Sequence, residues 1–302
     1  MRQRVLLLFI DGIGLGPADP AVNPLIAGGR EILKISAEQQ QLPSGGLCVA
    51  TDACLGVAGL PQSATGQTTL FTGINAAQAI GRHLQGFPNR QLRQIIGESS
   101  LFKKVIGAEL NATFANAYTH RFFEKRPRWT SVTTTMCETA NVRFRTMKDL
   151  ESGSSLFMDY SNRFLIDRGI EIPSRSPEEA AEILVRLASR YDLCVYEYFL
   201  TDLIGHRGTF AQAKALVAEL DRFISAVLDN ANLEQLSVIL TSDHGNLEDM
   251  RTKLHTTNPV PTMIWGPLRE HFSEGANGLS LTDLTPRITR FLTQHNGQPA
   301  AN

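Results

Sequence analysis

The chain has 302 residues, an apolar fraction of 42% and a formal net charge of −1 at pH 7. This length allows one large domain, or a core that carries an inserted segment, and the composition is typical of a globular protein. The near-zero charge offers no basic excess for nucleic acid or an anionic membrane surface, and no run approaches the roughly 20 apolar residues that cross a bilayer.

The first predicted element is a strand over Val5 to Ile10, because this continuous apolar run suits a strand that is buried on both faces. The run is too short for a signal peptide, and Asp11 follows it instead of a small-residue cleavage site. The four cysteines form no Cys-x-x-Cys pair, which is typical of reduced thiols. We therefore expect a cytoplasmic protein.

A Gly-containing segment further on predicts a turn and then a short helix over Thr69 to Ile74. Thr68 lies at the end of this turn, in Gly66-Gln67-Thr68-Thr69. Two other interpretations stay open for this position. A threonine here often serves only as a helix cap, and Thr69 is a rival for any chemical role.

The middle of the chain, residues 87–173, contains more aromatic and basic residues and shorter apolar runs than either end. We interpret it as a small inserted cap. The catalytic core would then consist of residues 1–86 together with 174–302. The aromatic and basic side chains of the cap could contact a substrate or only pack the cap, so none is assigned a role.

The second half alternates strands with amphipathic helices. Strands are predicted over Leu193 to Phe199 and Leu236 to Leu240, and helices over Pro177 to Tyr191 and Thr209 to Asn232. This alternation predicts βαβ units and a mostly parallel sheet, whose functional groups gather at the carboxyl ends of the strands. The polar residues from about Gln294 to Asn302 are expected to form a frayed tail.

Seven side chains at or near the ends of these elements could bind metal. They are Asp11, Thr68, Asp202, His206, Asp243, His244 and His255. Carboxylates and imidazoles with one hydroxyl suit Mn²⁺ or Zn²⁺, and seven ligands are enough for two divalent ions. Two ions close together suit in-line displacement at phosphorus. Asp202 and His206 could instead form a helical surface pair, but Gly205 between them favours a loop.

These motifs resemble the alkaline phosphatase superfamily of metalloenzymes, and within it the branch of cofactor-independent phosphoglycerate mutases and phosphopentomutases. The resemblance implies a three-layer αβα core with a mostly parallel sheet and a small inserted cap. The Cys-x-Pro-x-Arg sequence of the sulfatase branch is absent. The matching segments, in the order of the family, are Asp11-Gly12, Gly66-Gln67-Thr68-Thr69, Asp202-Leu203-Ile204-Gly205-His206, Asp243-His244-Gly245-Asn246 and His255-Thr256.

The resemblance divides the seven residues between two ions and makes Thr68 the nucleophile of a phosphothreonine intermediate. By this resemblance, the two kinds of mutase have longer chains and larger inserted domains than this chain. We therefore expect hydrolysis of a small phosphate ester. Intramolecular phosphate transfer is the alternative, and a non-catalytic binding protein for a phosphorylated metabolite is a second one. The sequence identifies neither the substrate nor the oligomeric state. The implied ligand sets are Asp11, Thr68, Asp243 and His244 for one ion, and Asp202, His206 and His255 for the other.

Overall fold

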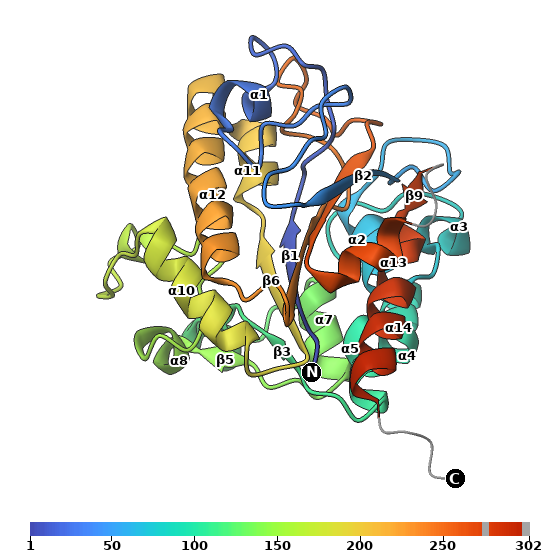
Figure 1. Ribbon diagram of the computed structural model, residues 1–302, viewed down its shortest axis with the longest axis vertical. Coiled ribbons are helices and arrows are strands. Elements are labelled where there is room, and N and C mark those ends of the chain that lie inside the picture. Colours follow the sequence, from blue (N-terminus) through green and yellow to red (C-terminus); the bar gives the residue numbers. More distant parts are fainter. Residues whose placement is uncertain (274–277, 298–302) are drawn as a thin grey trace.

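A seven-stranded sheet lies between two layers of helices in the computed structural model, which describes residues 1–273 and 278–297 (Figure 1). The strand order is β3-β6-β1-β7-β8-β2-β9. Strand β8 runs antiparallel to both of its neighbours, and the other pairings in this sheet are parallel. The bounds are β1 (Arg4–Ile10), β2 (Leu47–Asp52), β3 (Ala112–Phe114), β6 (Leu193–Tyr198), β7 (Leu236–Thr241), β8 (Val260–Trp265) and β9 (Leu279–Ser280).

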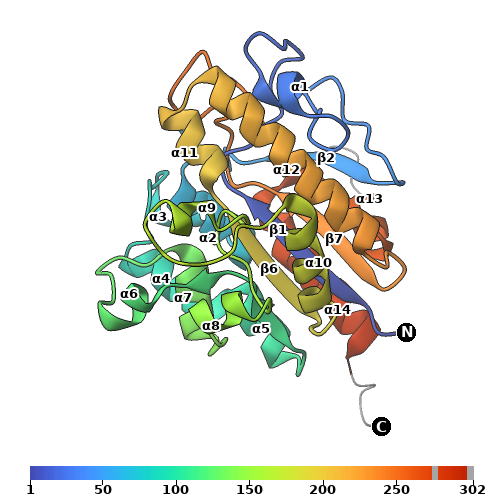
Figure 2. The same cartoon turned by 90° about the vertical axis from the view of Figure 1, so that its left-hand side faces the viewer.

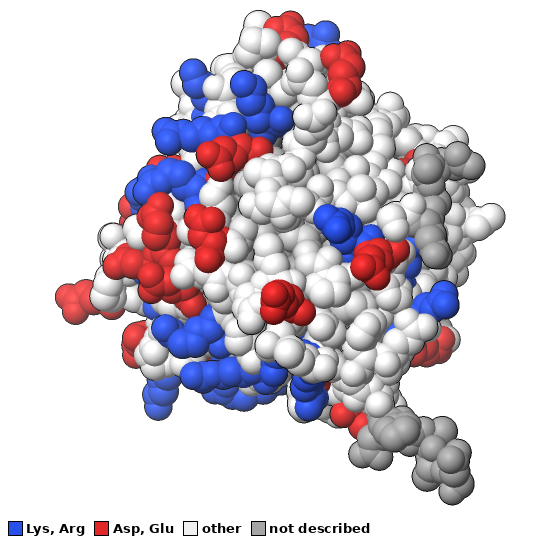
Figure 3. Space-filling model, viewed as in Figure 1, with Lys and Arg blue, Asp and Glu red and all other residues white. Residues whose placement is uncertain are grey.

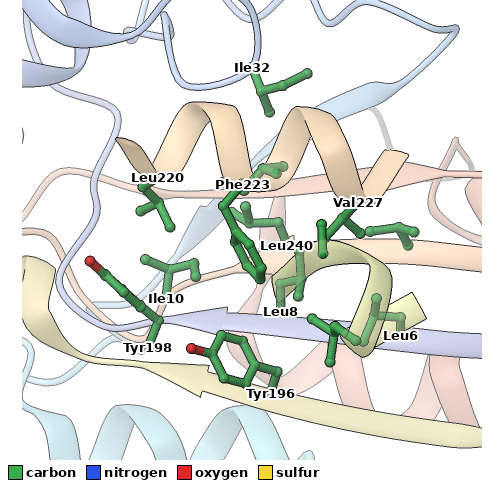
Figure 4. Packing of buried hydrophobic residues seen from close by; sticks show 14 of the residues in the cluster. Leu6, Leu8, Ile10, Ile32, Tyr196, Tyr198, Leu220, Phe223, Val227 and Leu240 are labelled. Atoms are coloured by element: carbon green, nitrogen blue, oxygen red, sulfur yellow. The ribbon is translucent and has the colours of Figure 1, made fainter. Parts of the chain in front are cut away.

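Successive residues of β1 pack into two different apolar layers. Leu6, Leu8 and Ile10 belong to the cluster formed with α1 (Pro24–Gly28), α10 (Pro177–Ala188) and α12 (Phe210–Asn230), and Figure 4 shows them facing α12. Val5, Leu7 and Phe9 belong to the cluster on the opposite face, with α2 (Ser63–Thr72), α5 (Leu101–Gly107) and α14 (Leu284–Asn296). Burial on both faces explains why this strand is continuously apolar.

The strands and helices predicted for the second half are confirmed, and Figure 2 shows α10 and α12 lying across one face of the sheet. Helix α10 begins at Pro177, and Ser176 caps it by accepting a hydrogen bond from the Glu179 amide. Both helices end two or three residues earlier than predicted. Helix α14 continues to Asn296, so the tail expected from Gln294 is partly helical, and residues 298–302 lie outside the described residues.

The predicted cap boundary at residue 87 differs from the structure. Strand β3 pairs with β6 in the main sheet, and α4 (Arg90–Ser99), α5 and α7 (Val132–Thr139) contribute to the apolar layer against that sheet. Only the rest of the region stands apart, around a small second sheet. The sequence did not predict β3 because this strand has three residues, too few to show a strand pattern. This outer part contains β4 (Ala117–Tyr118), β5 (Arg145–Thr146), α6 (His120–Glu124), α8 (Met147–Glu151) and α9 (Arg163–Ile166).

The remaining short helices lie at the edges of the core. They are α3 (Ala76–Ile80), α11 (Leu200–Arg207), α13 (Glu270–Ser273) and two 3-10 turns at Pro267–Arg269 and Leu281–Asp283. Among the described residues, no helix is long and apolar enough to cross a membrane. On the face in Figure 3, Lys and Arg residues mix with Asp and Glu residues along one side, in keeping with the small net charge.

Candidate metal centre

Six of the seven predicted site residues lie together at one edge of the sheet. Because parallel strands end at the same edge, residues that follow them converge there. His255 precedes β8, which runs in the opposite direction, so it reaches the same edge. The other five follow parallel strands: Asp11 after β1, Asp202 and His206 on α11 after β6, and Asp243 and His244 after β7.

Their side chains form two overlapping groups of potential ligands. Within each group, one ligand atom from every residue lies within 4.8 Å of the others. His206 lies beside the second group, with its Nε2 atom 3.0 Å from His255 Nε2 and 3.4 Å from Asp202 Oδ1. The groups are Asp11, Asp243 and His244, and Asp202, His244 and His255.

The carboxylate of Asp243 is fully buried, and neither of its oxygens has a hydrogen-bond partner. Asp11 Oδ1 is buried and unpartnered in the same way. Burial, together with the charges of Asp243 and Asp202, raises the pKa of Asp11 well above its ordinary value. Unpaired buried carboxylates are costly, and a divalent cation would satisfy these oxygens and offset their repulsion. This oxygen and nitrogen donor set fits Mn²⁺ or Zn²⁺.

Two of the histidines are held in the orientation that metal ligands need. His206 Nδ1 lies 2.7 Å from the Lys253 carbonyl oxygen, and His255 Nδ1 lies 2.7 Å from the Pro61 carbonyl oxygen. When each Nδ1–H donates to its carbonyl, the Nε2 lone pair is left free. Both Nε2 atoms then face the centre.

Thr68 does not join this group. Helix α2 begins at Ser63, six residues before the predicted start, so Thr68 lies in its interior with a fully buried side chain. Its hydroxyl donates to the Ala64 carbonyl oxygen at 2.6 Å. The rival Thr69 is also buried and donates to the Thr65 carbonyl oxygen.

Gly66 explains the error. A glycine at this position predicts a turn from the sequence, but Gly66 lies within α2, where a Cβ would be 2.6 Å from the Asp243 carbonyl oxygen. This glycine therefore allows the helix to pack against the backbone of a ligand residue. It does not mark a turn.

Ser63 provides the hydroxyl that Thr68 was expected to provide. It is the first residue of α2, and its Oγ lies 3.0 Å from Nε2 of His244, the residue that both ligand groups share. Ser63 was not among the residues predicted from the sequence. The available signal was a serine next to Pro61-Gln62 at the start of a helical segment, since serine is common at helix starts. A helix N-terminus also favours a bound phosphate.

Asp202 and His206 lie on a helix, α11, and not in the predicted loop. Gly205 lies within this helix, and a side chain is excluded there because a Cβ would lie 2.2 Å from Asn246 Oδ1. Asn246 Nδ2 in turn donates to Asp202 Oδ1 at 2.8 Å. The absent side chain thus makes room for an amide that orients a carboxylate of the second ligand group.

Gly205→Ala is expected to lower metal affinity about 10- to 100-fold, because the new methyl group displaces Asn246 and releases Asp202. Competition with a chromophoric chelator measures this affinity. Gly107→Ala is the matched control, since Gly107 is also helical and a Cβ there meets nothing within 4 Å. If Gly205→Ala bound Mn²⁺ or Zn²⁺ as tightly as Gly107→Ala does, the role given to Asn246 would be contradicted.

Glu248 connects the two loops that carry most of the candidate ligands. Its fully buried carboxylate accepts hydrogen bonds from the Gly14 amide at 2.8 Å, the Asn246 amide at 2.7 Å and Asn258 Nδ2 at 3.0 Å, and also from the Thr256 hydroxyl. Gly14 lies in the loop after β1, and the other partners lie in both halves of the long loop between β7 and β8. One carboxylate therefore holds the spacing of the centre.

A cavity of about 700 Å³ adjoins the centre, lined by Asp11, Ser63 and Asp202 on one side and by residues of the 87–173 region on the other. Glu197, near the end of β6, also lines it and accepts a hydrogen bond from the Thr133 hydroxyl at 2.7 Å. Burial raises the pKa of Glu197 to about 7. The site thus combines a hydroxyl, two ligand groups and a space for a small molecule.

The sequence profile of the metalloenzyme superfamily matches residues 3–295. A 2,3-bisphosphoglycerate-independent phosphoglycerate mutase from Prochlorococcus marinus is 32% identical over 136 residues, which cover 39% of this chain and 25% of that protein. The match thus spans about a quarter of the length of this curated relative.

Two solved structures share the fold. The PH0037 protein from Pyrococcus horikoshii has a TM-score of 0.60 at 16% identity, with 100% of this chain and 99% of that chain covered. A cold-active alkaline phosphatase from a psychrophilic Shewanella species has a TM-score of 0.50 at 11% identity, with 95% and 99% covered. The three-layer α/β architecture expected from the sequence is confirmed.

Proposed function

The chain belongs to the metalloenzyme superfamily, and from this membership we propose that it catalyses metal-dependent phosphoryl transfer, with hydrolysis of a small phosphate ester as its reaction. The position of Ser63 carries the proposal. Its hydroxyl lies at a helix N-terminus, beside His244, which both ligand groups share, and faces the cavity. A hydroxyl placed there can attack phosphorus while the helix N-terminus favours the phosphate.

Each functional residue has a role in this reaction. When bound, two divalent ions would favour the ionised form of the Ser63 hydroxyl and neutralise charge on the phosphoryl oxygens. Ser63 Oγ forms a bond to phosphorus as the bond from phosphorus to the ester oxygen breaks, and the alcohol leaves with a proton from solvent. Water then attacks the phosphoserine, which releases phosphate and restores Ser63. The proposed ligand sets are Asp11, Ser63, Asp243 and His244, and Asp202, His206 and His255.

Intramolecular phosphate transfer is the second candidate, because the curated relative is a phosphoglycerate mutase. A mutase must keep water away from the phosphorylated residue while a second hydroxyl of the substrate approaches it. Phe87 and Phe199, which line the cavity, are 52% and 39% exposed. This accessibility supports hydrolysis.

Supplying the metal-stripped protein with Mn²⁺ or Zn²⁺ and a panel of phosphate esters tests the proposal. Inorganic phosphate is measured in solution, and phosphorus NMR follows any change in the position of the phosphate on the ester. Metal-dependent release is the expected result. Isomerised ester without release would support the mutase, and bound ester without either product would indicate a binding protein for a phosphorylated metabolite.

A further inference from the structure

The cavity beside the metal centre has a second side that is markedly aromatic. Six rings line it, and they come from several separate segments of the chain. Ligand pockets combine such apolar walls with a few polar groups, and a volume of about 700 Å³ is in the usual range for a small molecule. The rings are those of Phe87, Phe114, Tyr118, Phe122, Phe157 and Phe199.

Contacts among the aromatic residues hold part of this wall in place. The ring centroids of Tyr118 and Phe122 lie 4.4 Å apart, and those of Tyr118 and Phe144 lie 4.8 Å apart. The Tyr118 hydroxyl is 2.9 Å from Thr134 Oγ1. The wall therefore offers fixed ring surfaces to a bound molecule, and ring stacking favours a flat partner.

The lining itself offers little positive charge to a second anionic group on the substrate, and Arg126 lies against the Phe122 ring, with its guanidinium carbon 5.0 Å from the ring centroid. Of the described residues that line the cavity, Arg207 is the one Lys or Arg, and its side chain is exposed. Glu197 also lines the cavity, as do Asp11 and Asp202, whose charges the metal ions would offset. A carboxylate beside the reacting phosphate is normally bound by Arg or Lys residues. The cavity thus matches an uncharged alcohol better than a phosphoglycerate.

Neutral and acidic groups supply hydrogen bonds deeper in the cavity. Glu197 is held by the Thr133 hydroxyl, and its backbone exchanges hydrogen bonds with the Asn116 side chain at 2.7 and 2.9 Å. Asn116, Ser131 and Thr134 also line the cavity. These groups can accept from, or donate to, the N–H and O–H groups of an uncharged ring or sugar.

We propose that the substrate is a phosphomonoester of an alcohol that carries a flat, uncharged aromatic group, as in aryl-alkyl phosphates and nucleoside monophosphates. The proposal rests on the phosphoryl-transfer function above. The phosphate lies at Ser63, and the aromatic group stacks on the wall that contains Tyr118 and Phe122.

Matched esters of primary alcohols test this substrate class, because their reacting bonds are alike. We expect kcat/KM for adenosine 5′-monophosphate or benzyl phosphate to exceed that for ribose 5-phosphate and 3-phosphoglycerate by about 10-fold or more, since stacking of one ring contributes roughly 1–3 kcal/mol. The two aromatic esters distinguish a nucleoside from an aryl substrate. Equal or higher kcat/KM values for the non-aromatic esters would overturn this inference and leave the phosphoryl-transfer function standing.

Adjacent residues of α6 provide a variant and its control. Phe122 lines the cavity, whereas Phe123 does not and is 41% exposed. Phe122→Leu is expected to lower kcat/KM for the preferred aromatic ester about 5- to 10-fold and to change that for ribose 5-phosphate less than about twofold. Phe123→Leu should change neither. A uniform loss across all esters in Phe122→Leu would overturn the stacking role.

Binding distinguishes failure of this inference from failure of the proposed reaction. Calorimetry with adenosine 5′-monophosphate and ribose 5-phosphate needs no turnover, and Ser63→Ala prevents any reaction during the titration. Tighter binding of the nucleotide, lost in Phe122→Leu and kept in Phe123→Leu, supports the aromatic site even if no phosphate is released. Equal binding of the two esters would overturn it.

Discussion

Ser63→Ala will lower the rate of phosphate release on the order of 10³-fold or more, because it removes the hydroxyl that lies 3.0 Å from His244 Nε2. The fold should be unaffected, because the Ser63 hydroxyl contacts His244 and the backbone hydrogen bonds of α2 remain in the variant. Thr68→Val is the matched control on the same helix. It removes a hydroxyl that donates only to the Ala64 carbonyl oxygen, so we expect a rate within a few fold of the wild type.

Trapping the intermediate identifies the nucleophile directly. Acid quenching during turnover, followed by peptide mass spectrometry, should find phosphate on Ser63. Phosphate on Thr68, together with loss of turnover in Thr68→Val, would restore the prediction made from the sequence and would require α2 to rearrange.

The strands and long helices could be predicted because their patterns are local. Strand β1 is buried on both faces and therefore reads as an unbroken apolar run, and α10 carries a complete capping box at Ser176. Strand β3 has only three residues, and the helices α4 and α5, which precede it in the chain, have 10 and 7 residues. Their place in the core depends on pairing with distant segments, which no local pattern reveals.

The site followed from topology except where a glycine was misread. Carboxylates and histidines at the ends of parallel strands converge whatever the loops do, so six of the predicted residues lie together. Gly66 and Gly205 were both taken as signs of irregular chain. Both lie in helices, at points where Asp243 or Asn246 approaches too closely for a Cβ. Such approaches are set by tertiary packing, and sequence alone does not separate them from turns.

Asp243→Asn should make the metal-free protein more stable while abolishing the stabilisation by metal. The Asp243 carboxylate is fully buried, has no hydrogen-bond donor and lies in the same ligand group as Asp11. An amide at this position removes one buried charge and can donate to Asp11. Relief of an unsatisfied buried group is worth about 1–3 kcal/mol, which corresponds to a rise in Tm of several degrees.

Thermal unfolding with and without Mn²⁺ or Zn²⁺ measures both effects. Metal should raise the Tm of the wild-type protein. At a free metal concentration of 100 times Kd, the free energy of unfolding should rise by about 2.7 kcal/mol. Asp243→Asn should begin higher, gain little, and lose phosphate release. Asp249→Asn is the control from the same loop, because the Asp249 carboxylate already pairs with Arg251 at 2.6 Å and its neutralisation relieves no repulsion in the centre.

A metal-free Asp243→Asn variant less stable than the wild type would show that the carboxylate contributes to folding without an ion. The expected result has a wider meaning for this centre. The sheet edge gathers unpaired carboxylates at a cost in stability, and a bound cation both offsets that cost and prepares Ser63 to react. The same buried charges would then account for metal affinity, for the low stability of the metal-free protein and for catalysis.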